Sequence, residues 1–383
     1  MVTSKTNKEK FDAVQVLRAL AAALVVFQHA VMNWAEKAIA PGPIPYFPDM
    51  GDYGVKLFFC ISGFIIVHTA TALPSGWDSS KTFWRRRIRR IVPLYWIVTA
   101  AYLVKTVASG QHVGLAEVLQ SYFFIPYVNP HGLVQPILGQ GWSLNYEMLF
   151  YLAFGATFFL PRRWHAPAVA ALMTALAAAR AFGWLGNPAS AGALYYWADA
   201  IVLYFVAGVV ACLVAQQWRS RKWPGLSQGW AALVASAIVV AFAGFALPAD
   251  EPLAFGWMPA ACIVPLLLCI TAQPRPIGAI WQPIVIAGDA SYSTYLTHGF
   301  LMGPLARLLG GLSVTGSLGY HGFAWICVVA CTAAGYLIFV GLERPLHTGR
   351  FPRPFGKRRP SVLQSHAQPV VPVVQPQPLD RAQ

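Results

Sequence analysis

Ten apolar stretches, most of them close to 20 residues long, dominate this chain of 383 residues. A helix needs about 20 apolar residues to cross the hydrocarbon core of a bilayer, so these stretches predict membrane-spanning helices. The stretches lie at 14–34, 54–72, 91–108, 144–160, 165–182, 197–215, 229–247, 256–272, 284–305 and 321–341. The sequence therefore predicts an all-α, polytopic integral membrane protein with about ten transmembrane helices.

Composition and charge agree with this fold class. Charged residues make up 11% of the chain and hydrophobic residues 57%, whereas soluble domains are about 25% charged. The net charge of +14 lies in short basic clusters between apolar stretches, so we interpret it as a topology signal and expect no nucleic-acid partner. Cytoplasmic loops hold the excess of Lys and Arg, and ten alternating segments place 23 of the 28 on one side. Both termini are predicted to be cytoplasmic.

The remaining segments suggest one domain and a tail. Residues 1–346 form the predicted membrane-embedded domain, and the Pro- and Gln-rich residues 347–383 a disordered cytoplasmic tail. The loop at 109–141 lacks Lys and Arg and is predicted to cap the outer mouth of the bundle. The triplet at 38–40 resembles a signal-peptide cleavage site, but the 18-residue apolar run before it favours a retained helix.

The first apolar stretch contains two ionisable residues, Arg18 and His29. They are eleven residues apart, so on a helix they share one face at about 16 Å from each other. An ionisable group in hydrocarbon costs several kcal/mol and usually faces a protein interior where it is used. The alternative for His29 is a hydrogen bond to a neighbouring helix.

A cluster of five arginines occupies positions 85–90, at the predicted inner end of the third stretch. Arginine binds phosphate oxygens in a bidentate manner, so the cluster is a candidate site for a phosphorylated cytoplasmic ligand. The alternative is a positive-inside anchor that contacts anionic membrane lipids. The six cysteines all fall in apolar stretches without metal-ligand spacing to histidines, which predicts neither disulfides nor a metal site.

Three further motifs place polar residues at helix positions. In 141–151, Ser143 and Glu147 share a face, either as substrate-binding groups or as a helix cap with a dipole-favoured acid. In 291–298, Tyr295 and His298 lie on one stripe, for which hydrogen-bonded packing is the alternative. Asp52 is placed to pair with Lys56 at i,i+4 near the outer mouth, and Ser62-Gly63 would permit close helix approach.

Taken together, these motifs resemble the acyltransferase 3 family, in the branch that includes exopolysaccharide acetyltransferases. The resemblance covers residues 11–345. It rests on Arg18 with His29, GVKLFFCISGF at 54–64, RRRIRRIVP at 85–93, GWSLNYEMLFY at 141–151, SYSTYLTH at 291–298 and ERP at 343–345. Lys56 departs from the family pattern, in which this position is often acidic.

The resemblance implies a ten-helix enzyme of the inner membrane that moves an acyl group, usually acetyl, from cytoplasmic acyl-CoA to a carbohydrate hydroxyl. Arginines of the first and third helices would bind the phosphates of acetyl-CoA, namely Arg18, Arg86, Arg87, Arg89 and Arg90. His29 would act as general base or as a transiently acylated nucleophile, and Glu147 would bind the acceptor or support the base. The residues expected at the substrate are Asp52, Trp142, Ser143, Tyr146, Tyr295 and His298.

Two alternatives stay open at this stage. A transporter of a sugar or lipid-linked intermediate would also need polar groups at mid-membrane, although no internal repeat is evident in the sequence. An acyltransferase could also use peptidoglycan, a lipid or a macrolide-type acceptor. The partners expected in the preferred interpretation are membrane lipids and a carbohydrate acceptor.

Overall fold

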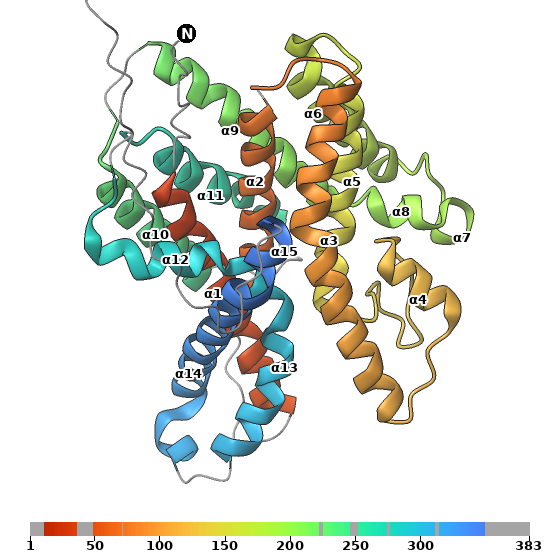
Figure 1. Ribbon diagram of the computed structural model, residues 1–383, viewed down its shortest axis with the longest axis vertical. Coiled ribbons are helices and arrows are strands. Elements are labelled where there is room, and N and C mark those ends of the chain that lie inside the picture. Colours follow the sequence, from red (N-terminus) through yellow and green to blue (C-terminus); the bar gives the residue numbers. More distant parts are fainter. Residues whose placement is uncertain are drawn as a thin grey trace, which may run out of the picture.

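The computed structural model describes residues 11–36, 49–70, 72–221, 225–245, 252–273, 276–310 and 314–348 (Figure 1). The helices are α1 (Asp12–Glu36), α2 (Met50–Ala70), α3 (Trp77–Ala108), α4 (Leu115–Tyr122), α5 (Trp142–Thr157), α6 (His165–Ala181), α7 (Pro188–Ala191), α8 (Ala193–Trp197), α9 (Leu203–Ser220), α10 (Gln228–Phe245), α11 (Pro252–Ile270), α12 (Gln282–Asp289), α13 (Ser291–Gly310), α14 (Val314–Ile338) and α15 (Arg344–Thr348). Within these residues the only β-structure is one bridge between Val128 and Val134. The predicted all-α class is confirmed.

Each of the ten predicted stretches coincides with a helix, and the ninth is divided at Ala290 between α12 and α13. In the part of the chain that the structure describes, five helical segments are long and apolar enough to cross a membrane, namely Asp12–Trp34, Met50–Ala70, Trp77–Ala108, Ala200–Ser220 and His321–Thr348. Shorter apolar helices cover Gln228–Ala243 and Trp257–Ile270. Such a set of apolar helices indicates an integral membrane protein. The triplet at 38–40 and the tail beyond residue 348 lie outside the described residues.

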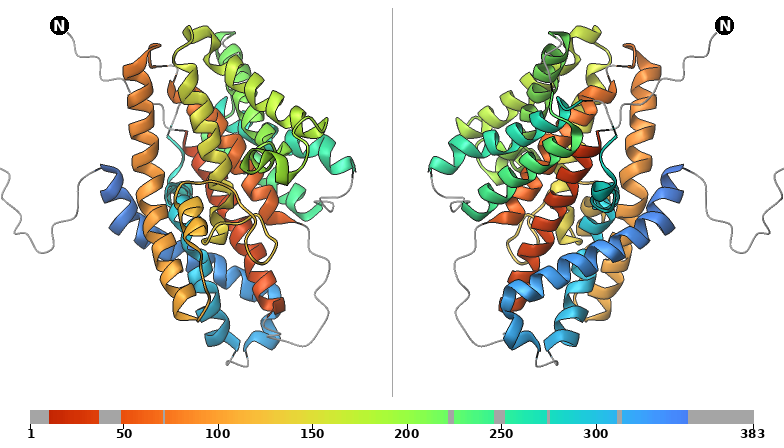
Figure 2. Two further views of the ribbon diagram at one scale, coloured as in Figure 1. Left: turned by 90° about the vertical axis from the view of Figure 1, so that its right-hand side faces the viewer. Right: turned by 90° about the vertical axis from the view of Figure 1, so that its left-hand side faces the viewer.

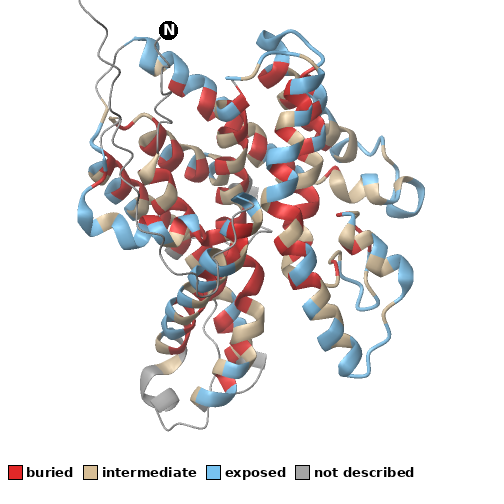
Figure 3. Ribbon diagram, in the orientation of Figure 1, coloured by how far each residue is buried: buried red, intermediate tan, exposed pale blue. Residues whose placement is uncertain are grey.

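Helix α1 runs through the middle of the bundle (Figures 1 and 2) and contacts α2, α10, α11, α12, α13 and α14. Small residues let its neighbours come close. A Cβ atom on Gly54 of α2 would lie 2.6 Å from the Ala21 carbonyl oxygen, and one on Gly288 of α12 would lie 2.0 Å from that of Gln15. Close backbone approach of this kind is how helices associate in lipid, where apolar side chains gain little by meeting each other. Buried residues accordingly gather along α1 and α2 (Figure 3).

Helices α2 and α9 cross at two glycines. A Cβ atom on Gly63 would lie 2.2 Å from the Phe205 carbonyl oxygen, and one on Gly208 would lie 1.9 Å from that of Cys60. The close approach expected from Ser62-Gly63 is therefore confirmed. Next to the crossing, the ring of Phe205 stacks between Phe59 and Phe150, with centroid distances of 4.4 and 4.6 Å.

The loop at 109–141 is ordered and packs along α3. Helix α4 within it accepts a hydrogen bond from Tyr95 at the Ser121 carbonyl oxygen (3.0 Å) and one from Trp96 at that of Tyr122 (3.0 Å). The loop ends in a 3₁₀ turn, Gly139–Gly141, where the Gln140 carbonyl oxygen accepts a hydrogen bond from the Tyr295 hydroxyl (2.8 Å). The loop is therefore a segment packed on α3 that reaches α13 through this turn, and its expected place over the outer mouth stays a prediction.

Replacing Gly208 by Val is expected to destabilise the protein by about 1–3 kcal/mol, because the added side chain meets backbone that cannot move aside. Thermal unfolding of the purified protein in detergent would measure the loss. Gly303→Ala is the matched control, since a Cβ atom there meets nothing within 4 Å. Equal unfolding temperatures for the two variants would contradict the close α2–α9 crossing.

Candidate functional site

A pocket of about 740 Å³, partly open to solvent, lies between α1, α2, α3, α5 and α13. We call it the central pocket. Its polar lining comes from Arg18, Ser62, Arg87, Arg90, Ser143, Glu147, Tyr151, Ser291, Tyr292 and Tyr295. Motifs from five separate parts of the sequence thus meet at one cavity, as expected if they serve one function.

Two of the arginines in the central pocket are buried. Arg18 is 8% exposed and Arg87 is 9% exposed. Arg18 donates to Gln15 Oε1 (3.1 Å), and Arg87 donates to Thr69 Oγ1 (3.0 Å). The Arg87 guanidinium also lies 5.7 Å from the Tyr151 ring centre, but its Nε has no hydrogen-bond partner. Because buried charges are costly unless they are compensated, this arrangement suits an anionic ligand.

The structure divides the arginine cluster. Arg87 and Arg90, at i,i+3 on α3, face the central pocket, whereas Arg85, Arg86 and Arg89 are exposed. A helix turns by about 100° per residue, so one surface cannot collect all five side chains. Arg86 and Arg89, expected at the ligand phosphates, therefore lie outside the pocket lining, while Arg18, Arg87 and Arg90 lie within it.

Glu147 is the acid of the central pocket. It accepts hydrogen bonds from the Ser62 hydroxyl (3.0 Å) and from the Tyr151 hydroxyl. Its carboxylate also interacts electrostatically with the guanidinium groups of Arg18 and Arg87. Glu147 is thus held on the arginine side of the pocket.

Ser143 connects α5 to α13 instead of capping a helix. Helix α5 begins at Trp142 without a side-chain cap, and the Ser143 hydroxyl lies 2.7 Å from the Tyr295 hydroxyl. Because Tyr295 donates its one proton to the Gln140 carbonyl oxygen, Ser143 must be the donor to Tyr295. The helix-cap alternative for Ser143 is therefore wrong. On the same wall of the pocket, the buried hydroxyl of Ser291 has no hydrogen-bond partner.

Two histidines lie beyond Tyr295. The rings of His29 and His298 are 5.0 Å apart, and the His298 ring is 6.1 Å from that of Tyr295. His29 Nδ1 lies 2.9 Å from the Val25 carbonyl oxygen and His298 Nδ1 lies 2.6 Å from that of Tyr295. Because a carbonyl oxygen only accepts, both neutral rings carry the proton on Nδ1 and the lone pair on Nε2.

The two histidines differ in environment. His298 is 1% exposed, and its Nε2 has no hydrogen-bond partner. His29 is exposed and does not line the central pocket, so the expectation that its ring faces the protein interior is wrong. Tyr295 lines the pocket and contacts His298, so the tyrosine lies between the arginine-lined cavity and the histidine pair.

Glu343 is a site residue that the sequence motifs did not identify. It lies in a π-helical turn, Phe339–Glu343, is 6% exposed and accepts a hydrogen bond from the buried Ser293 hydroxyl. Its carboxylate interacts electrostatically with the guanidinium groups of Arg18 and Arg90. The ERP motif at 343–345 contributed to the family resemblance, but no functional role was expected for Glu343 itself. The sequence signal that could have identified Glu343 was an acid at the end of the last apolar stretch. In the structure, its π-helical turn is a second indication, because such turns frequently occur at functional sites.

Four expected substrate residues lie outside the lining of the central pocket, namely Asp52, Trp142, Tyr146 and His298. Asp52 pairs with Lys56, as the i,i+4 spacing predicted. Tyr146 is buried, and its ring contacts those of Phe59 and Trp142, with centroid distances of 6.3 and 6.0 Å.

All six cysteines are buried thiols. Within the described residues, no three His, Cys, Asp or Glu side chains gather as metal ligands.

Comparison with known proteins identifies similar sequences. The family model of the acyltransferase domain Acyl_transf_3 matches residues 11–340. The exopolysaccharide production protein ExoZ of Rhizobium meliloti is 33% identical over 78% of this chain and 90% of its own length. The acyltransferase MdmB of Streptomyces mycarofaciens is 28% identical over 81% of this chain and 83% of its own length. A putative peptidoglycan O-acetyltransferase, YrhL of Bacillus subtilis, is 24% identical over 92% of this chain and 57% of its own length. No solved structure matches the chain.

Proposed function

The chain belongs to the Acyl_transf_3 acyltransferase family, and from this premise we propose that it is a membrane O-acyltransferase that uses acyl-CoA. The donor is acetyl-CoA from the cytoplasm. The acceptor is a hydroxyl of an exopolysaccharide or of its lipid-linked precursor. The similarity to a protein of exopolysaccharide production over most of both chains favours this acceptor over peptidoglycan.

One observation carries the proposal. The central pocket brings the buried guanidinium groups of Arg18 and Arg87 into one cavity with Tyr295, which in turn contacts the histidine pair. A phosphate-binding end and a proton-accepting end are the two elements that transfer from a phosphorylated thioester requires.

Arg18, Arg87 and Arg90 bind the phosphates of the donor. Arg87 Nε and the Ser291 hydroxyl are buried without hydrogen-bond partners among the described residues, and a bound ligand would satisfy them. Arg86 and Arg89 are exposed on the same helix. We assign these two to the membrane surface, where they interact with anionic lipid headgroups.

His29 acts as the general base. Its Nε2 takes the proton from the acceptor hydroxyl as the oxygen attacks the thioester carbonyl carbon, and the departing thiolate then takes up that proton. In the variant mechanism, His29 Nε2 attacks first and holds the acyl group. His298 lies against His29 with an unpartnered Nε2 and stabilises the protonated imidazole.

Glu147 acts on the donor side. Its hydrogen bond from Tyr151 and its interaction with Arg87 link it to the phosphate-binding end of the pocket. Glu343 has a similar role, because it interacts electrostatically with Arg18 and Arg90. Both carboxylates compensate the buried guanidinium groups before the donor binds. The acceptor hydroxyl then enters from the exposed side of His29.

We also propose the complete topology, with ten spans, cytoplasmic termini and a location in the inner membrane. The membrane domain in this arrangement spans residues 1–346. Loop accessibility tests this arrangement. In intact cells, a membrane-impermeant maleimide should label a cysteine placed at Gly186, which follows α6, but not one placed at Ser220, which ends α9. Labelling of Ser220→Cys before permeabilisation would refute this topology.

Replacing His29 by Ala should reduce acetyl transfer by at least about 100-fold, since a positioned base contributes typically 10²–10⁴-fold. The assay is release of free thiol from acetyl-CoA by purified protein with an acceptor oligosaccharide. His321→Ala is the matched control, because His321 lies on α14, where its ring contacts Phe27 of α1, and does not line the central pocket. Wild-type protein that moves a sugar across vesicles without releasing thiol would instead be a transporter.

Arg87→Ala and Arg86→Ala form a matched pair on adjacent residues. Loss of a charged hydrogen bond to the donor should raise KM for acetyl-CoA about tenfold or more in Arg87→Ala. Arg86→Ala should stay within about twofold of wild type, because an exposed guanidinium is well solvated. Equal effects of the two substitutions would contradict the division of the arginine cluster.

A further inference from the structure

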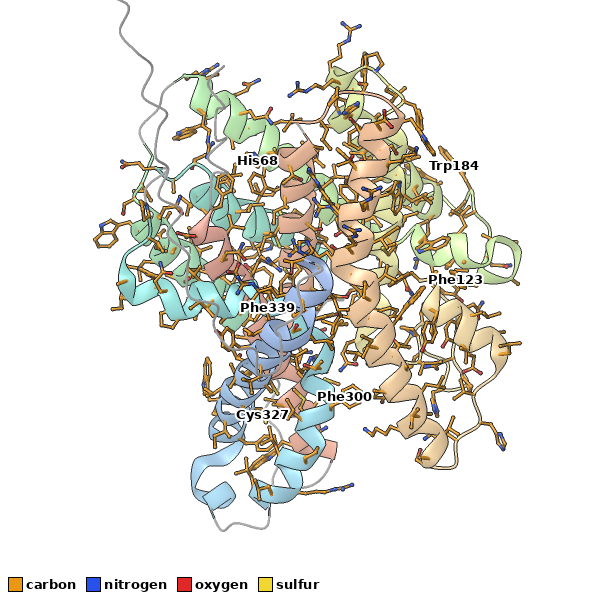
Figure 4. The ribbon with its side chains drawn as sticks, viewed as in Figure 1. His68, Phe123, Trp184, Phe300, Cys327 and Phe339 are labelled. Atoms are coloured by element: carbon orange, nitrogen blue, oxygen red, sulfur yellow. The ribbon has the colours of Figure 1, made fainter. Side chains whose placement is uncertain are left out.

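A second cavity of about 680 Å³ lies between α2, α9, α11 and the turn before α6. We call it the rim cavity. It shares no lining residue with the central pocket. On α2 the central pocket uses Ser62 and Ile65, whereas the rim cavity uses Phe64 and His68. These pairs lie on different faces of the helix, and His68 lies near its C-terminal end (Figure 4).

Aromatic rings form the interior of the rim cavity. Phe11 contacts Phe64 and His68 edge to face, with ring centroids 5.4 and 5.0 Å apart, and Phe64 stacks on His68 at 5.5 Å. Phe64 is buried, whereas Phe11 and His68 are half-buried. The cavity therefore offers flat apolar surface next to its opening.

Basic side chains form the rim. The Arg219 guanidinium lies 5.3 Å from the Phe11 ring centre, and its Nη2 donates to the Ile270 carbonyl oxygen (2.9 Å). These two contacts hold the side chain over the cavity. Arg162, from the turn before α6, lines the same cavity and is exposed. Two guanidinium groups from separate elements thus converge at one opening.

The rim cavity continues the polar face of α1. Phe11 precedes Arg18 by seven residues, which places them on one face about 10 Å apart. Arg18 belongs to the central pocket and Phe11 to the rim cavity. The two cavities are therefore successive sites along the direction of α1, each with arginines from separate elements.

We propose that the rim cavity binds a phosphate ester, with the phosphate on Arg162 and Arg219 and the adjoining part of the ligand against Phe11 and Phe64. Guanidinium groups recognise phosphate through paired hydrogen bonds, and an aromatic surface suits a flat or apolar neighbouring group. A nucleotide and an anionic phospholipid headgroup share this chemistry. The site is additional to the donor and acceptor sites of the proposed function and does not depend on them.

Binding to the full-length protein in nanodiscs tests the proposal in two arms. The first titrates uridine 5′-monophosphate, a nucleotide phosphate that is not part of coenzyme A, into discs of zwitterionic lipid by calorimetry. The second counts phosphatidylglycerol molecules retained on the protein by native mass spectrometry. The variants are Arg162→Ala and Arg219→Ala, and the control is Arg163→Ala, whose guanidinium lies 6.0 Å from the Trp164 ring centre and does not line the cavity.

Loss of one charged contact should weaken binding about tenfold in Arg162→Ala and in Arg219→Ala, with Arg163→Ala unchanged. Weakening in the first arm identifies a nucleotide phosphate, and weakening in the second identifies a lipid phosphate. The proposal is overturned if neither arm distinguishes the two variants from wild type, or if Arg163→Ala loses as much affinity as they do. Because both readouts are binding, failure of the acyltransferase assay would leave this result unaffected.

Discussion

The burial of two guanidinium groups inside a helical bundle is the constraint on which the rest of the structure depends. Arg18 and Arg87 come from different helices, and each is at least nine-tenths buried. Removing such a charge from water costs several kcal/mol unless other groups compensate it. Electrostatic interactions with Glu147 compensate part of this cost for both arginines, and those with Glu343 do so for Arg18.

This polar centre is possible because the surrounding helices pack closely elsewhere. The glycines at 54, 63, 208 and 288 bring α2, α9, α12 and α1 into backbone contact. Close packing on those faces fixes the helices, so α1, α2, α3, α5 and α13 can leave a cavity between them without losing their arrangement. The π-helical turn before α15 contains Glu343, which is buried and interacts electrostatically with Arg18 and Arg90.

The sequence motifs contain much of the polar lining of the central pocket, but they did not predict how the arginine cluster divides between the pocket and the surface. The Arg18–His29 spacing predicted one helix face, and the structure places Arg18 at the central pocket with His29 beside His298 beyond it. The arginine cluster was treated as one unit, yet only Arg87 and Arg90 face the cavity. Glu343 was missed, because its burial depends on a local π-helical turn that residue patterns do not reveal.

The sequence by itself determined the all-helical membrane fold, the approximate positions of the long apolar helices and the relative directions of polar residues such as Arg18 and His29 on one helix. These follow from local rules, because a chain in lipid must satisfy its backbone within each helix and the helical repeat fixes relative directions. Only the tertiary structure decided which faces meet. Contacts such as Ser143 with Tyr295, 152 residues apart, depend on how helices cross, and crossing is set by packing over the whole bundle.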